Sequence, residues 1–200
     1  MKSWLLPILA FAWVMAPTAY ANSSYTWDFD PASNTSLGTH ILFYGNGGIG
    51  IAATARAGLY YKVARGDVGL GLACCNSDHE IEPGQAIVFN LSNLFSRKVT
   101  AITLTLVSIE TGEAGKVCDD FHACMTFGAS DNGKPVNILA LYRDMQAHHS
   151  GLLTVTSVRG DVLVNQLTAT ASVVPEPGSL MLMGSGFLAM IGFVRRKSRI

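Results

Sequence analysis

The sequence VTAITLTLV at residues 99–107 decides the fold class, because its apolar and polar residues alternate with a period of two. Three aliphatic residues at positions 102, 104 and 106 alternate with Thr103 and Thr105. Successive side chains of a β-strand point to opposite faces, so the aliphatic side chains share one face and the threonines the other. The segment is therefore predicted to be a half-buried strand.

Similar short runs, rich in β-branched residues, occur through the rest of the chain. Further predicted strands cover residues 49–56, 59–64, 68–73, 85–91, 152–158 and 162–173. The triplets Asp131-Asn132-Gly133 and Arg159-Gly160-Asp161 are typical turns between strands. Residues 138–148 are the one helical candidate. We expect an all-β, jelly-roll-like β-sandwich ectodomain over residues 22–173.

The overall charge excludes some function classes. The chain has 14 Lys+Arg and 14 Asp+Glu, and its charged fraction of 14% is low for a globular protein. Residues 22–177 keep nine basic and fourteen acidic residues, a net charge of about −5. A mildly acidic domain does not favour nucleic acid or anionic lipid, so no nucleic-acid partner is expected.

The N-terminus has the features of a secretory signal peptide over residues 1–21. Lys2 supplies the positive start, residues 4–15 are uncharged and apolar, and Ala19 and Ala21 are the small residues of a cleavage site. A retained membrane helix is the alternative, but the run is short and is interrupted by proline.

The C-terminus, residues 174–200, has three parts in order. A Pro-Glu-Pro motif comes first, at Val174, Pro175, Glu176, Pro177 and Gly178. Residues 178–194 then lack charge and would extend about 25 Å as a helix, the short end of what spans a bilayer. The basic tail, residues 195–200, has cations at Arg195, Arg196, Lys197 and Arg199. We predict a transmembrane helix with a cytoplasmic stop-transfer tail rather than a buried core helix.

This order of motif, apolar helix and basic tail resembles the PEP-CTERM sorting signal of Gram-negative bacteria, a segment also called an ice-binding-protein C-terminal domain. The resemblance implies that exosortase, a membrane cysteine protease, is the partner that processes the chain. It implies a precursor anchored in the inner membrane and a mature form at the cell surface or outside the cell. Proteins of this kind are often linked to exopolysaccharide and biofilm.

The four cysteines are disulfide candidates, because an exported domain matures in an oxidising compartment. Cys118 and Cys124 could close a small loop between neighbouring strands, which would leave Cys74 and Cys75 as a strained adjacent pair. Crossed bridges between the two pairs are slightly favoured, and the sequence leaves the pairing open. The C-x2-C spacing of a zinc site is absent.

Two acidic segments make calcium the one cofactor to consider. Asp78 and Glu80 lie in the first, and Asp119 and Asp120 lie in the second. If crossed disulfides joined the segments, oxygen ligands of the kind that Ca²⁺ prefers would cluster. Two separately solvated loops are the favoured interpretation, and no other metal or cofactor is expected.

Residues 45–50 fit the pattern G-x-G-x-x-G, a fingerprint of dinucleotide sites. That site needs a helix after the glycines, whereas a strand-like run follows here, so a glycine-rich hairpin or bulge region is predicted. No nucleophile elbow, P-loop or H-E-x-x-H motif occurs.

These features predict a non-enzymatic surface protein that serves adhesion or exopolysaccharide association. The alternative is a secreted, glycan-acting hydrolase that uses acids such as Asp119 and Asp120, although adjacent side chains on a strand diverge. Aromatic residues could form sugar platforms, but packing in the core is the favoured role. These are Tyr25, Trp27, Phe29, Tyr60 and Tyr61.

Overall fold

The structure, a computed structural model, describes residues 21–30, 33–64, 66–74 and 77–173, and it confirms the all-β prediction. In these described ranges strands predominate, joined by short turns and one α-helix, α2 (Leu139–Ala147). The strands are β1 (Ala21–Asp28), β2 (Thr35–Tyr44), β3 (Gly50–Ala64), β4 (Asp67–Leu72), β5 (Ala86–Asn90), β6 (Lys98–Val107), β7 (Ala114–Asp119), β8 (Cys124–Gly128), β9 (Pro135–Asn137), β10 (Leu152–Arg159) and β11 (Leu163–Val173).

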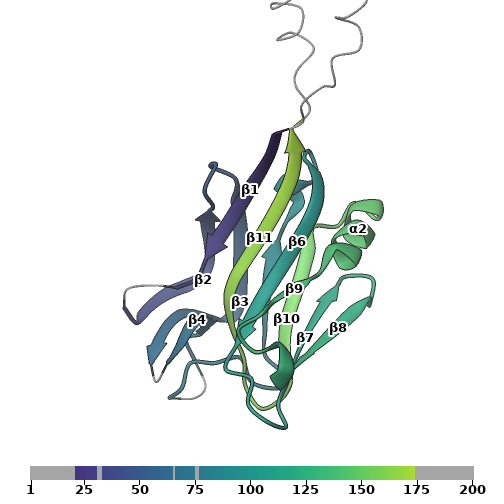
Figure 1. The fold of residues 1–200 in the computed structure, drawn as a ribbon. Coiled ribbons are helices and arrows are strands. Elements are labelled where there is room, and N and C mark those ends of the chain that lie inside the picture. The colour runs from purple at the N-terminus through teal and green to yellow at the C-terminus, as the bar shows by residue number, and fades with distance from the viewer. Residues whose placement is uncertain (1–20, 31–32, 65, 75–76, 174–200) are drawn as a thin grey trace, which may run out of the picture. The chain divides into compact units, whose positions relative to one another are not determined.

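The strands form one curled antiparallel sheet in the order β8-β7-β10-β5-β3-β4-β11-β6-β9, with β1 beside β11 and β2 beside β3. Strand β3 belongs to both halves, because residues 52–54 pair with β5 whereas residues 59–64 pair with β4. The sheet thereby folds over into two layers, one with β5, β10 and β7 and the other with β11, β6 and β9 (Figure 1). The inner faces of the layers enclose one core, as in a β-sandwich.

The alternation predicted for residues 99–107 is confirmed in β6 except at Thr105, which is buried. Ile102, Leu104 and Leu106 are buried, whereas Thr103 lies on the outer side beside Thr168 of β11. In the other layer the buried side chains come from alternate positions of each strand. They are Ile51, Ala53 and Ala55 of β3, Ile87 and Phe89 of β5, Val117 of β7, Phe127 of β8, and Leu153 and Val155 of β10.

Strand β1 contributes the largest buried side chain. Trp27 is 1% exposed, and its indole N–H donates to the Ile49 carbonyl at 2.9 Å. Tyr25 and Phe29 are buried on the same face, so the expectation that these aromatic residues pack in the core is confirmed.

The glycine-rich segment at residues 45–50 is the turn of the β2–β3 hairpin, as predicted. A Cβ at Gly45 would lie 2.9 Å from the Thr26 carbonyl oxygen and 3.0 Å from the Trp27 ring nitrogen, so only glycine lets the turn approach β1 this closely. Gly47 has a φ of 93°, which favours glycine for a second reason. The pattern that resembled a cofactor fingerprint therefore serves packing.

One predicted strand boundary is absent from the structure. The predicted strands 49–56 and 59–64 are a single strand, β3, which continues through Gly58 at a φ of 80°. The helix predicted at 138–148 is confirmed as α2, and its Tyr142 hydroxyl donates to the Leu94 carbonyl at 2.9 Å. Strands β1, β2, β7, β8 and β9 were not predicted.

The chain enters and leaves this domain at the same end. Strands β1 and β11 are neighbours, and the Phe29 N–H donates to the Asn165 carbonyl at 2.8 Å. The start of β1 and the end of β11 therefore lie side by side (Figure 1). Within the described ranges, no helix is long and apolar enough to cross a membrane. The predicted signal peptide up to residue 20 and the predicted span at 178–194 lie outside those ranges.

Candidate functional site

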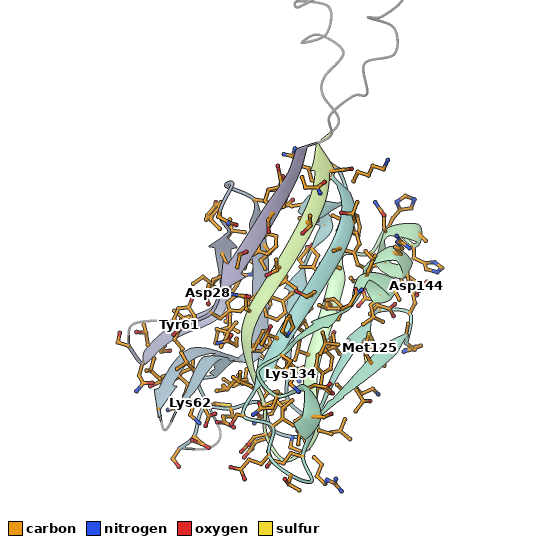
Figure 2. The ribbon with its side chains drawn as sticks, in the orientation of Figure 1. Asp28, Tyr61, Lys62, Met125, Lys134 and Asp144 are labelled. Carbon is orange, nitrogen blue, oxygen red and sulfur yellow. A yellow bond between two sulfur atoms is a disulfide. The ribbon has the colours of Figure 1, made fainter. Side chains whose placement is uncertain are left out.

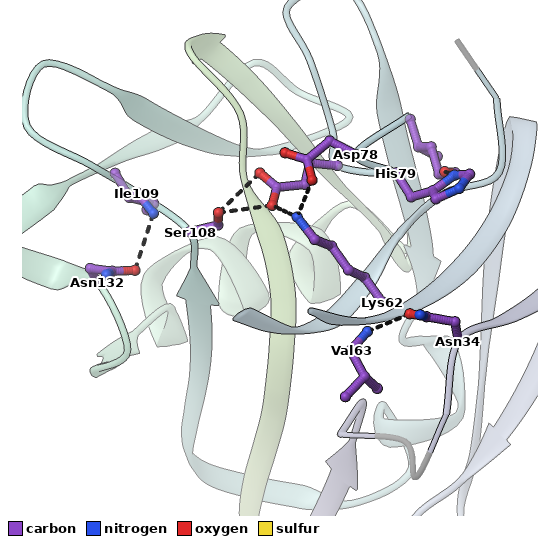
Figure 3. A network of polar contacts seen from close by, with 10 residues as sticks. Asn34, Lys62, Val63, Asp78, His79, Ser108, Ile109 and Asn132 are labelled. Atoms are coloured by element: carbon purple, nitrogen blue, oxygen red, sulfur yellow. Dashed lines mark hydrogen bonds and ion pairs between the residues drawn. The ribbon is translucent and has the colours of Figure 1, made fainter. Parts of the chain in front are cut away.

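A cluster of charged side chains lies at the end of the domain away from the start of β1 (Figure 2). Its members are Lys62, Asp78, Glu80, Ser108 and Asp161. The Lys62 ammonium donates to Asp78 at 2.7 Å and pairs with Glu80 as well. The Ser108 hydroxyl oxygen lies 2.9 and 3.0 Å from the two carboxylate oxygens of Glu80 (Figure 3).

Four separate segments bring these residues together. Lys62 lies in the second half of β3, whereas Asp78 and Glu80 follow β4. An antiparallel bridge between Ile81 and Val162 places the Arg159-Gly160-Asp161 turn next to Glu80. Ser108 follows β6 with a φ of 63°, an uncommon conformation for a residue other than glycine. The site is thus assembled by tertiary structure.

Burial determines the electrostatics of the cluster. The Glu80 residue is 1% exposed and Lys62 4%, whereas the Asp78 side chain is 47% exposed. Desolvation raises the pKa of Glu80 to about 7, and the neighbouring Asp161 carboxyl adds to the rise against the opposing effects of Lys62 and Ser108. Burial lowers the pKa of Lys62, but its bonds to Asp78 and Glu80 outweigh burial and leave that pKa raised.

Glu80 should make the stability of the domain depend on pH. Its pKa is raised from 4.5 to about 7 in the folded state, so the folded state binds this proton more tightly than the unfolded state does. The stability that Glu80 gains from this proton is fully present below pH 4.5 and is lost as the pH rises to about 7. We expect the unfolding free energy of the wild type, relative to Glu80→Gln, to fall by about 1–3 kcal/mol across this window. Urea titrations at several pH values would measure the difference.

A second variant checks the cause of that pH dependence. Ser108→Ala removes a hydrogen bond that lowers the pKa of Glu80, so the window should move to higher pH. If the unfolding free energies of the wild type and Glu80→Gln differ by the same amount at every pH, the assignment of this titration to Glu80 is contradicted.

The second acidic segment is the β7–β8 turn, where the carboxylates serve the turn itself. One oxygen of Asp119 accepts the N–H groups of Phe121 and Ala123 at 2.8 and 2.9 Å. Asp119 is buried, and its other oxygen has no hydrogen-bond partner in the described part of the chain. Asp120 is exposed and accepts a hydrogen bond from the Ser150 hydroxyl. Asp119 and Asp120 therefore do not form an open pair of catalytic acids.

The condition for a shared calcium site, crossed disulfides that join the two acidic segments, is not met, because Cys118 pairs with Cys124. Asp119 pairs with Leu153 at the start of β10, whereas Asp161 follows the end of that strand at Arg159. Six residues of strand separate these positions by roughly 20 Å. Calcium binding at Asp78 and Glu80 stays a prediction, and an ion there would have to share the carboxylates with the Lys62 ammonium.

The cysteines pair locally, which corrects the slight preference for crossed bridges. Cys118 and Cys124 are cross-strand neighbours in the β7–β8 hairpin and form a disulfide. Their Cα atoms lie 4.1 Å apart, because the short turn holds the two strands directly opposite each other. Cys74 is also disulfide-bonded, and Cys75 lies outside the described ranges.

A shallow surface pocket of about 570 Å³ lies elsewhere, over the first half of β3 and the neighbouring β5. Part of its lining is formed by Thr54 and Arg56 of β3, Ala86 and Val88 of β5, and Gln85, which precedes β5. None of these residues was predicted to be functional. The signal that the sequence offered was weak: two polar residues, Thr54 and Arg56, at alternate positions of an apolar strand.

The sequence offered a clearer signal for the ion cluster, although only Asp78 and Glu80 were predicted as candidate ligands. Lys62 interrupts an apolar strand in the predicted segment 59–64, and a buried lysine needs a carboxylate partner. Asp161 was assigned to a turn only. That Lys62 and Asp161 both lie beside Glu80 could not be read from the sequence, since nearly a hundred residues separate the two.

The sorting residues, 174–178 and 195–200, lie outside the described ranges, and so does Ala19 of the predicted cleavage site. Ala21, after which cleavage is predicted, is the first residue of β1. A comparison with curated proteins found no match to this chain.

A comparison with family models supports the resemblance noted in the sequence. Residues 173–197 match the PEP-CTERM protein-sorting motif. This motif implies an exported protein whose precursor is anchored in the membrane by its C-terminus. The chain thus carries a PEP-CTERM protein-sorting motif that begins at Val173, the last residue of β11, and this motif supports an exported protein that an exosortase-type system sorts.

Proposed function

We propose that residues 22–173 form a non-enzymatic binding domain that the C-terminal segment delivers to the cell surface, where the domain associates with matrix exopolysaccharide. The observation that carries this proposal is the sorting motif at residues 173–197. The proposal includes cleavage of a signal peptide after Ala21, a transient transmembrane helix at 178–194 and processing by an exosortase-type membrane protease.

The form of the domain is compatible with this role. Its first and last strands are neighbours, so one end carries both chain ends and the rest of the surface is left open for contacts. The sandwich-like sheet, which we interpret as jelly-roll-like, and the Cys118–Cys124 disulfide suit a domain that works outside the cell.

A glycan hydrolase is the second candidate, and one observation favours it. Ligand oxygens of Asp78, Glu80 and Asp161 lie within 4.8 Å of one another, and the pKa of Glu80 is raised to about 7, as for a general acid. Against it, Glu80 is buried and already paired with Lys62. Release of reducing ends from a glycan, abolished by Glu80→Gln, would establish hydrolysis; binding without turnover supports the proposed function.

The sorting part of the proposal is tested by replacing the motif in native cells. The variant P175A/E176A/P177A should accumulate as a membrane-bound precursor with its C-terminus intact, because the extended segment that a protease would recognise is lost. Mass spectrometry of both chain ends, together with fractionation into membrane, cell surface and matrix, measures the result. Ser198→Ala leaves the motif intact and is the matched control.

Two results would contradict the proposal. Unchanged processing of P175A/E176A/P177A would show that this motif is not what the protease recognises. A wild-type protein that reaches the surface but washes away from the polysaccharide matrix, while remaining folded, would contradict the binding role alone.

A further inference from the structure

The outer face of the layer formed by β2, β3, β5, β10, β7 and β8 has a regular composition. The register places one outward row across five strands, in which His40 is paired with Thr54, Thr54 with Val88, Val88 with Thr154 and Thr154 with Cys118. A second row runs from Ala86 through Thr156 to Lys116. These side chains are mostly small or carry hydroxyl groups, so they leave an open surface with hydrogen-bonding groups along it.

This face differs in charge from the rest of the domain. Residues 22–173 have nine basic and thirteen acidic residues, a net charge of about −4, yet the one acidic residue in these six strands is Asp119, which is buried. Arg56 is exposed and Lys116 is partly exposed on the outer face. Neither has an ion-pair partner among the described residues.

The pocket lies at the Arg56 end of this face. Arg56 and Ala86 both line its volume of about 570 Å³, together with Thr54. From Ala86 the second row continues through Thr156 to Lys116 on β7. Three strand spacings separate the β3 and β7 positions, roughly 14 Å. An extended chain that crosses the strands can therefore meet the guanidinium, threonine hydroxyls and the ammonium in succession.

We propose that this face binds an extended acidic polysaccharide, with Arg56 and Lys116 pairing with its carboxylates and with Thr54 and Thr154 facing its hydroxyl groups. The inference rests on the proposed function and adds the site and the ligand class to it. Arginine suits the task, because its planar guanidinium pairs with a carboxylate through two parallel hydrogen bonds.

The charge density on the face favours a polyuronate over a nucleic acid. A nucleic acid carries a phosphate at every nucleotide, and its binding requires many cations on a surface that is basic overall. Here three cations lie outside the core on these strands of an acidic domain, Arg56, Lys116 and, at the end of β10, Arg159, whereas the one acidic residue, Asp119, is buried. A polymer with well-separated carboxylates and many hydroxyl groups matches that arrangement.

The test uses the full chain in detergent and immobilised polygalacturonate as the probe. The wild type should bind polygalacturonate and not its carboxyl-reduced form, which has the same backbone without the charges. R56Q/K116Q should bind about tenfold more weakly, about 1.4 kcal/mol. K98Q/R143Q removes two exposed cations from β6 and α2, so it has the same net charge and should bind within about twofold of the wild type.

The other outcomes overturn this assignment. They are no binding to polygalacturonate, equal binding to the carboxyl-reduced polymer, equal losses in the two double variants, or tighter binding of a single-stranded DNA of equal length. Circular dichroism confirms that each variant is folded. If the wild type stays in the matrix of native cells but does not bind polygalacturonate, this site is wrong and the proposed function stands; if it leaves the matrix, the proposed function fails.

Discussion

Replacing Lys62 by methionine is expected to destabilise the domain by about 3–5 kcal/mol. Lys62 is 4% exposed and is the one cation in contact with Asp78 and Glu80 in the described cluster. Methionine fills a similar volume but leaves Glu80 buried beside Asp161 with no ion-pair partner among the described residues. Urea unfolding of residues 22–173, followed by circular dichroism at neutral pH, would measure the loss.

A double variant separates the loss of charge balance from the loss of packing. K62M/E80M replaces both buried charges by apolar groups, which is often close to neutral in stability, so it should recover most of the loss. Lys98→Met changes an exposed lysine of β6 and should shift stability by less than about 0.5 kcal/mol. A loss below about 1 kcal/mol in Lys62→Met, or no recovery in the double variant, would refute the electrostatic explanation.

Removal of the Trp27 side chain is expected to cost about 3–5 kcal/mol. Trp27 is among the largest fully buried side chains, lies in the core between the layers, and holds the Ile49 carbonyl through its indole N–H. Trp27→Ala therefore leaves a large cavity and removes one of two hydrogen bonds to the Ile49 carbonyl, which keeps the one from the Gly45 N–H. Circular dichroism is the suitable probe, because the variant lacks the tryptophan that reports on this domain.

Two further substitutions identify the source of that cost. Trp27→Phe keeps an aromatic ring but loses the N–H donor, so it should cost about 1–3 kcal/mol. Tyr44→Ala removes an aromatic side chain of β2 that is 69% exposed and should cost less than about 0.5 kcal/mol. Equal losses at Trp27 and Tyr44 would contradict the core position of Trp27.

The strands with clear alternation were predictable because their side chains report their burial directly. In β6, aliphatic residues at 102, 104 and 106 had to face a core, whatever the neighbours were. Strands β7 and β8 gave no such signal, because Gly115, Lys116 and the two cysteines break the alternation. These strands are stabilised by pairing in the sheet, β7 with β10 and β8 with β7. The same limit applied to β1, whose alternation of aromatic and polar residues was interpreted only as candidate core rings.

The candidate sites show the same division. Asp78 and Glu80 were identified from an acidic run, but their partners Lys62, Ser108 and Asp161 come from distant segments that only the fold brings together. The cysteine pairing needed the hairpin geometry, since residue types alone allow three pairings.

The sequence by itself determined the all-β class and the sorting motif, because both depend on local order: a period of two in one case, and three consecutive segments of distinct chemistry in the other. Only the tertiary structure decided that Lys62 is held among carboxylates, that Cys118 pairs with Cys124, and that a weakly basic face crosses six strands of an acidic domain. These features depend on register and on contacts between distant segments, where free energy is gained only once the strands have paired.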